Sequence, residues 1–305
     1  MSAPVAPRKS LSRKVLLIPL AWMLVFFAAP FAIVAKISIS QSALAQPPYE
    51  PVFNWADSVA EWLSRAGQFS FESYRTLIGD SLYFDAYLSS LWIAAISTIA
   101  ALLIAYPFAL SISRASSRWR PVLFVLAVAP FWTSFLIRVY AWIAILKDEG
   151  FLNHALMALG IVSEPLHIFA TDTAVVVGIV YSYLPFMVLP IYVALEKQDV
   201  ALIEAAADLG ASPWRAFRQI TLPLSLPGVL TGCLLVFIPA VGEFVIPDLL
   251  GGSDTLMIGR TMWVEFFDNR DWPTAAAAAI LLLAVLLLPL HLYDRLQRNA
   301  EGSHA

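Results

Sequence analysis

The sequence predicts an all-α, polytopic membrane protein with six transmembrane helices. Hydrophobic residues make up 60% of the 305 residues and charged residues 13%, about half the charged fraction of soluble domains. The apolar residues gather into six runs, each close to the roughly 20 residues that a helix needs to cross a membrane core of about 30 Å. Most polar residues lie between these runs.

The predicted spans are residues 15–35, 88–112, 121–143, 173–195, 227–248 and 274–293. They define a tail at 1–14, a transmembrane domain at 15–293 and a second tail at 294–305. The positive-inside rule places both termini in the cytoplasm. Twelve basic residues then fall in cytoplasmic segments and six in outer segments, while Arg138 lies within a span.

The first span resembles a secretory signal in one respect, because SALAQ at 42–46 is typical of a cleavage site after a basic start. Signal sequences have an apolar region of about 7–15 residues, and this run is longer. Lys36 also separates the run from SALAQ. We therefore expect an uncleaved membrane anchor.

The longest loop, residues 36–87, faces outward in this topology. It contains two amphipathic stretches, at 56–67 and 71–80, which we expect to form short helices in the membrane interface. The pattern favours a lid or packing loop over a folded module.

The fifth span contains PAVGEFVIP at 239–247, where two prolines and a glycine interrupt the apolar run. Proline in a spanning helix frees carbonyl groups that neighbouring helices or water must satisfy. A kinked or partly unwound segment lining a cavity and a kink buried in protein both fit this pattern.

The cytoplasmic loop at 196–226 has helical patterns on both sides of Gly210. Gly210 suits the left-handed conformation that often ends a helix. Ser212 and Pro213 then stand at the N-cap and first helical positions of a second helix. That helix carries aromatic and basic side chains, so the loop is either a docking site for a partner or a hairpin in the membrane interface.

The same loop resembles the EAA loop of binding-protein-dependent ABC importer permeases. Three residues separate EAA at 204–206 from Gly210, and nine more precede ITLP at 220–223. The resemblance implies a type I ABC importer permease fold and a coupling helix that seats in a cytoplasmic ATPase. The residues expected to make this contact are Glu204, Ala205, Ala206, Asp208, Gly210, Ser212, Trp214 and Arg215.

The chain has no G-x-x-x-x-G-K-[ST] phosphate loop. We therefore expect no ATPase activity and no cofactor of its own, with ATP and magnesium bound by a separate subunit. The expected partners are two ATPase subunits, a paralogous second permease, a periplasmic or lipid-anchored solute-binding protein, and membrane lipid, without nucleic acid.

A membrane enzyme is disfavoured because H-E-x-x-H and G-x-G-D motifs are absent. A passive channel is disfavoured because it would not need the EAA loop. The scattered histidines and single cysteine predict no metal site.

Two further segments, 130–146 and 237–260, resemble permease subunits of putrescine/spermidine importers, especially the putrescine type. This resemblance covers most of the chain beyond about residue 85. Opine permeases are similar to this group, so an opine remains an alternative cargo. Another small cationic solute is a further alternative.

A cationic cargo also fits the charges of the spans. Glu243 is the one acid clearly inside a predicted span, and ionisable groups there are functional candidates because their burial is costly. Asp248 follows it, and aromatic side chains would offer cation–π contacts. Glu243 paired with Arg138, and aromatics placed as interfacial anchors, are the structural alternatives. The aromatic candidates are Trp132, Tyr140, Trp142, Tyr181, Tyr183 and Phe244.

Overall fold

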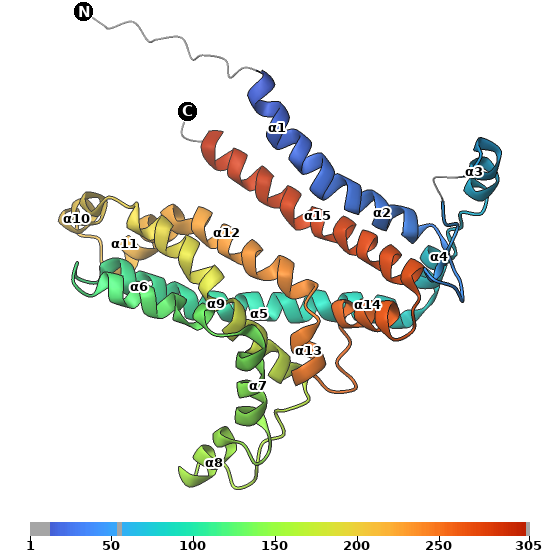
Figure 1. The fold of residues 1–305 in the computed structure, drawn as a ribbon. Helices are drawn as coiled ribbons and strands as arrows, with labels where there is room; N and C mark the ends of the chain where they lie inside the picture. The colour runs from blue at the N-terminus through green and yellow to red at the C-terminus, as the bar shows by residue number, and fades with distance from the viewer. Residues whose placement is uncertain (1–12, 54–56, 303–305) are drawn as a thin grey trace, which may run out of the picture. The chain divides into compact units, whose positions relative to one another are not determined.

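The computed structural model describes residues 13–53 and 57–302, most of them helical (Figure 1). Most of the predicted first tail, residues 1–12, and residues 303–305 of the second tail lie outside the described residues. The chain divides into two compact units. The first contains residues 1–79 and 265–281, and the second contains residues 80–264 and 282–305.

The first unit begins with a continuous helical run. It consists of α1 (Arg13–Met23), the π-helical turn η1 (Leu24–Ala28) and α2 (Ala29–Ser38). An antiparallel ribbon of β1 (Gln41–Ser42) and β2 (Tyr49–Glu50) follows. The short helices α3 (Val59–Ala66) and α4 (Glu72–Gly79) confirm the two helices predicted in the outer loop.

The second unit holds most of the remaining helices. In chain order these are α5 (Ser81–Arg114), α6 (Arg120–Val128), the 3-10 turn η2 (Ala129–Trp132), α7 (Phe135–Leu146), α8 (Phe151–Ala158), α9 (Asp172–Glu196), α10 (Val200–Asp208), α11 (Pro213–Ala216), the π-helical turn η3 (Phe217–Thr221), α12 (Leu222–Val241), α13 (Val245–Leu250) and α14 (Ile258–Phe267). The last helix, α15 (Trp272–Gly302), has residues in both units, and α14 ends in the first.

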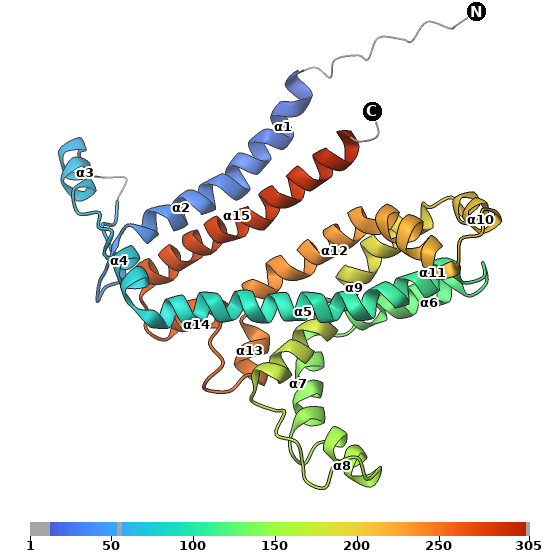
Figure 2. The same cartoon turned by 180° about the vertical axis from the view of Figure 1, so that it is seen from behind.

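The long helices α5, α9 and α12 pack side by side at the centre of the second unit (Figure 1, Figure 2). Ala101, Ala105 and Ala109 of α5 are fully buried at a spacing of four residues. Small residues at this spacing let membrane helices approach closely. Gly228 of α12 has the same role, because a Cβ there would lie 2.5 Å from the carbonyl oxygen of Pro190 in α9.

Among the described residues, five helical stretches are long and apolar enough to cross a membrane: Leu17–Ser38, Ser81–Arg114, Asp172–Glu196, Pro213–Val241 and Trp272–His291. A bent pair of helical stretches, Arg120–Trp132 and Phe135–Ala158, would make a sixth crossing. The number of predicted spans therefore agrees with the structure when the bent pair counts as one.

The third predicted span, 121–143, is wrong as a continuous helix, because its two parts meet at 91°. Pro130 has no N–H group and disrupts the helical hydrogen bonds. Thr133 is extended after η2, and its hydroxyl donates to the carbonyl of Pro130 at 2.9 Å. The backbone thus leaves the helix at the proline and resumes as α7 in another direction.

The fifth predicted span, 227–248, is also divided. α12 ends at Val241, and α13 begins at Val245 after three non-helical residues. The partly unwound segment predicted within 239–247 is therefore confirmed. The sixth span continues beyond its predicted end, since α15 extends to Gly302 and makes the described part of the second tail helical.

Candidate functional site

The loop at 196–226 forms two short helices joined at Gly210, as the sequence predicts. We call residues 200–216, which comprise α10, α11 and their connection, the α10–α11 knob. The Asp199 carboxylate accepts from the amide of Ala201 at 3.0 Å and caps α10. Ser212 caps α11 by accepting from the amide of Arg215 at 3.4 Å. Both helix starts are thus specified by local sequence.

Gly210 sits in the left-handed region with φ of +79°. The amide of Ala211 donates to the carbonyl of Ala206, and that of Gly210 donates to Ala207, each at 2.9 Å. These two hydrogen bonds satisfy backbone carbonyl groups at the end of α10. A Cβ at Gly210 would meet no atom within 4 Å, so the backbone conformation, and not space, requires glycine.

The knob carries large apolar side chains at the surface. Leu209 is 89% exposed and Trp214 69% exposed, and no residue of α10 is buried. It lies at the end of the second unit where α5 finishes and α6 begins (Figure 1). Apart from the half-buried Ala206, the residues predicted to contact an ATPase are all exposed: Glu204, Ala205, Asp208, Gly210, Ser212, Trp214 and Arg215.

The base of the knob is tied to the central helices by contacts that the sequence did not indicate. The side-chain amide of Gln198 donates to the backbone carbonyl of Thr221 at 2.9 Å and so links the two ends of the loop. Tyr106 of α5 shares a hydrogen bond of 2.8 Å with Ser225 and packs edge-on against Phe217. These contacts link the base of the knob to α5 and α12.

A second feature is a cavity of about 510 Å³ at the interrupted end of α12. Its wall includes residues of α7, α9 and α13, which pack against one another (Figure 1). We call it the Glu243 cavity. Its lining residues are Phe131, Phe135, Arg138, Ser182, Tyr183, Phe186, Pro239, Gly242, Glu243, Phe244 and Val245.

Glu243 is 8% exposed, and its carboxylate is well provided with donors. One oxygen accepts from the backbone amides of Val245 at 3.0 Å and Ile246 at 3.4 Å, at the start of α13. The other oxygen accepts from the hydroxyl of Tyr183 on α9. Glu243 therefore joins the interrupted helix to its neighbour and places its carboxyl group on the cavity wall.

Arg138 lines the same cavity and is 9% exposed. Within the described part of the chain it forms no ion pair with Glu243, so the predicted alternative of an Arg138–Glu243 pair is not found. Its guanidinium carbon lies 5.7 Å from the ring centre of Phe131 and 5.8 Å from that of Phe135. The sequence placed Arg138 in a span but did not show that it shares a cavity with Glu243.

Two of the six predicted path residues, Glu243 and Phe244, lie on the cavity wall. Phe244 also stacks on Trp263, with ring centres 4.5 Å apart. Tyr183, predicted as a cation–π partner, lines the cavity as well, but its hydroxyl is used by Glu243. Ser182 and Phe186 share the wall, and sequence reasoning missed both. Their spacing relative to Tyr183 on one face of α9 was the available signal.

The other four predicted path residues do not line the cavity. Asp248 forms an ion pair with Arg260 at 3.3 Å. Tyr181 packs edge-on against Trp142 with ring centres 5.4 Å apart, and Trp132 and Tyr140 are exposed. A path role for these residues stays a prediction.

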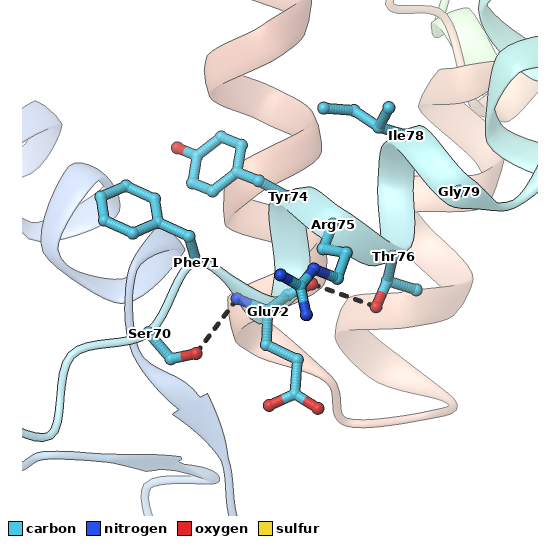
Figure 3. Close-up of a pocket in the computed structure, with 8 residues that line it drawn as sticks. All are labelled: Ser70, Phe71, Glu72, Tyr74, Arg75, Thr76, Ile78 and Gly79. Carbon is cyan, nitrogen blue, oxygen red and sulfur yellow. Dashed lines mark hydrogen bonds between the residues drawn. The ribbon is translucent and has the colours of Figure 1, made fainter.

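A second hollow, of about 790 Å³, lies along α4 in the first unit (Figure 3). Ser70 accepts from the amide of Glu72, and the Thr76 hydroxyl donates to the Glu72 carbonyl, each at 3.1 Å. Phe71 and Tyr74 lie on one side of the helix in Figure 3, with ring centres 6.1 Å apart. These contacts shape α4 itself and bring no convergent set of charges together.

Residues 98–301 match the family model described as binding-protein-dependent transport system inner membrane component. The match includes the knob and the Glu243 cavity. The chain is 45% identical over 230 residues to the spermidine/putrescine transport system permease protein PotB of Escherichia coli (strain K12), covering 75% of this chain and 83% of that protein. It is 44% identical over 224 residues to the Haemophilus influenzae protein of the same name, covering 73% and 78%.

The fold is similar to that of a chain in the crystal structure of a bacterial alginate ABC transporter in complex with an alginate pentasaccharide-bound periplasmic protein. The TM-score is 0.69 at 17% sequence identity, and the match covers 94% of each chain. At this identity the likeness concerns the fold alone.

Proposed function

The chain belongs to the binding-protein-dependent transport system inner membrane components, and from this premise we propose that it is a permease subunit of an ATP-driven polyamine importer. The expected type I ABC importer permease fold is confirmed, and the protein is a multi-pass component of the bacterial inner membrane. The observation that carries the cargo is the similarity to two spermidine/putrescine permeases over about three quarters of the chain. Putrescine is the cargo we propose within this class.

The α10–α11 knob is proposed as the contact for the ATPase. Its exposed leucine and tryptophan side chains would be buried in a cleft of that subunit, and burial of apolar surface stabilises such contacts. The energy for transport then comes from outside the chain, because the sequence lacks a phosphate-binding loop. Gln198 and Tyr106 would carry the movement of the knob to the central helices.

The Glu243 cavity is proposed as part of the cargo path. A diammonium needs its charges met by carboxylates or aromatic faces, and its methylenes by an apolar wall. Glu243, Phe244 and the neighbouring phenylalanines supply these features. An ammonium at Glu243 would replace the hydroxyl of Tyr183 as a donor, which keeps binding weak enough for release.

The proposed cycle needs four kinds of partner. A solute-binding protein delivers the polyamine to the outer side, and a paralogous second permease completes the path. Two ATPase subunits close on ATP and turn the cavity outward through the knob. Hydrolysis then returns the cavity to the inward-open state.

An opine importer is the second candidate, and one observation favours it. Opines carry carboxylates, and the Glu243 cavity contains the guanidinium of Arg138. Guanidinium groups bind carboxylates through charge-assisted hydrogen bonds. The cargo is therefore best decided by direct comparison.

The decisive experiment reconstitutes the chain with its operon partners in proteoliposomes. ATP hydrolysis and uptake are measured with the binding protein and putrescine, spermidine or an opine. We expect the largest stimulation with putrescine, a smaller one with spermidine and none with the opine. The chain alone should hydrolyse no ATP. Stimulation by the opine without stimulation by either polyamine would contradict the proposed cargo.

A further inference from the structure

Arg138 has hydrogen-bonding capacity that the described residues leave unused. Its Nε and Nη1 atoms are buried and have no hydrogen-bond partner among the described residues. The hydroxyl of Ser182 on α9, which is 4% exposed, also has no partner among the described residues and lines the Glu243 cavity. Two unpartnered polar side chains, each more than nine-tenths buried, thus line one cavity.

Leaving these groups unpaired in the working protein would be costly. A buried donor without an acceptor loses the hydration it had in water, and a buried charge loses more. The rings of Phe131 and Phe135 offer cation–π contacts, but at 5.7 and 5.8 Å they satisfy no N–H group. An acceptor from outside the chain would remove this cost.

Glu243 is the one acid among the described residues that line the cavity, and its oxygens are already in use. They accept from Tyr183 and from the amides of Val245 and Ile246. The unpartnered donors of Arg138 and Ser182 therefore have no acceptor of their own in the cavity. A negatively charged oxygen group is the ligand that this arrangement fits.

The surface beside Arg138 indicates what covers the cavity. Phe186 of the cavity wall is 38% exposed, and Phe131 and Phe135, which also line the cavity, are half-buried. The rings of Phe131 and Phe135 lie next to the guanidinium of Arg138, so this apolar surface adjoins it. Acyl chains of lipid would suit the apolar part but provide no acceptor for a guanidinium, whereas an acidic side chain on an apolar protein surface would suit both.

We propose that Arg138 and Ser182 receive a carboxylate side chain from the second permease subunit. The inference rests on the proposed function for the existence of that subunit. Arg138 donates from its guanidinium and Ser182 from its hydroxyl to the carboxylate oxygens. This contact fixes α7 of one subunit against the other at the wall of the cargo path. It also explains how a cationic side chain is tolerated in a path for cationic cargo, because the partner's acid neutralises it.

The test uses the assembled importer in lipid nanodiscs without cargo. Cryo-electron microscopy should place a carboxylate oxygen of the second permease within about 3.2 Å of an Arg138 nitrogen. Arg138→Gln should weaken the association of the two permeases at least tenfold in co-purification titrations, and Arg138→Lys about threefold, since lysine keeps the charge.

Ser182→Ala and Ser97→Ala form a matched pair of variants. Both hydroxyls are buried and unpartnered in the described structure, but Ser97 lies on α5 away from the cavity. We expect Ser182→Ala to weaken the association about threefold and Ser97→Ala to leave it unchanged. Thermal melting of each isolated subunit separates loss of association from loss of folding.

The inference is overturned if Arg138 in the complex faces water, a lipid phosphate, Glu243 or a carboxylate of the cargo. It is also overturned if Arg138→Gln folds and associates like the parent. Replacing the partner's acid should cause the same loss, with no further loss in the double variant. A complex that shows the contact but imports no polyamine would refute the proposed cargo alone, and polyamine import without the contact would refute only this inference.

Discussion

The α10–α11 knob and the Glu243 cavity are incomplete in opposite ways. The knob exposes leucine and tryptophan side chains, while its backbone and capping groups are satisfied locally. The cavity buries an arginine and a serine whose polar atoms have no partner among the described residues. One region exposes groups that favour burial, and the other buries groups that need an acceptor.

This difference indicates two kinds of partner contact. A knob that is locally complete can keep its shape and transmit force as a rigid body to a separate motor. A cavity that lacks an acceptor depends on its neighbour for its electrostatics. Variants in the knob should therefore affect coupling, whereas variants in the cavity should affect cargo handling or assembly.

The largest effect is expected for Gly210→Val. A β-branched residue resists the left-handed conformation, which costs an L-residue roughly 1–2 kcal/mol, so the knob should change shape. We expect uptake to fall more than tenfold, with uncoupled ATP hydrolysis or loss of the ATPase from the purified complex.

Gly160→Val is the matched control for that change. Gly160 ends α8 with φ of +68° and also has no atom within 4 Å of a Cβ position. It lies outside the knob, so the same local strain should leave coupling largely intact. Equal loss in both variants would mean that strain, and not docking, explains the effect of Gly210→Val.

The second-largest effect is expected for Glu243→Gln. Loss of the negative charge removes the attraction for an ammonium group while the complex still assembles. We expect uptake to fall about tenfold, which corresponds to about 1.4 kcal/mol, with basal ATP hydrolysis preserved. Uptake kinetics in proteoliposomes measure this, and Asp254→Asn in an exposed outer turn is the control. Unchanged kinetics would remove Glu243 from the path.

A smaller effect is expected for Gln198→Ala. The hydrogen bond to Thr221 closes the base of the knob, and one such bond contributes about 0.5–1.5 kcal/mol. We expect cargo-stimulated ATP hydrolysis to fall about threefold without a change in the KM for cargo. Gln219→Ala, at an exposed position of the adjacent π-helical turn, should have no effect. A change in KM alone would place Gln198 with the cavity and weaken the contrast between the regions.

The smallest effect concerns the capping box of α3, which lies in neither region. The backbone amide and the hydroxyl of Ser58 both donate to the carboxylate of Glu61. These hydrogen bonds, the backbone one having the larger effect, hold the pKa of that carboxyl below its usual value. A lowered pKa means that the ionised form stabilises the helix. The contribution of ionised Glu61 to the stability of α3 is complete when the pH is above the ordinary glutamate pKa. It disappears as the pH falls through the lowered pKa that Glu61 has in the folded protein.

Glu61→Gln should therefore speed hydrogen exchange of α3 amides about threefold at neutral pH. The difference from the parent should vanish in acid, and uptake at neutral pH should be unchanged. Slower uptake would show that the outer segment takes part in transport.

The spans illustrate how far sequence reasoning reaches. Long apolar runs predicted the helices now seen at α5, α9 and α15, because a backbone in lipid must satisfy its own hydrogen bonds. The 91° break after Pro130 was missed, since proline is compatible with both a kinked and a broken helix. What decides between them is the packing of α7 against α9 and α13, which the local sequence does not contain.

The sequence alone determined the helical class, the number of spans and the shape of the α10–α11 knob. These features depend on hydrophobic periodicity, capping residues and the backbone freedom of Gly210, all of which are local. Only the tertiary structure decided that Glu243 bonds to Tyr183 and that Arg138 shares its cavity without pairing with it. Which charged groups meet depends on how distant helices pack, and no short-range pattern encodes that distance.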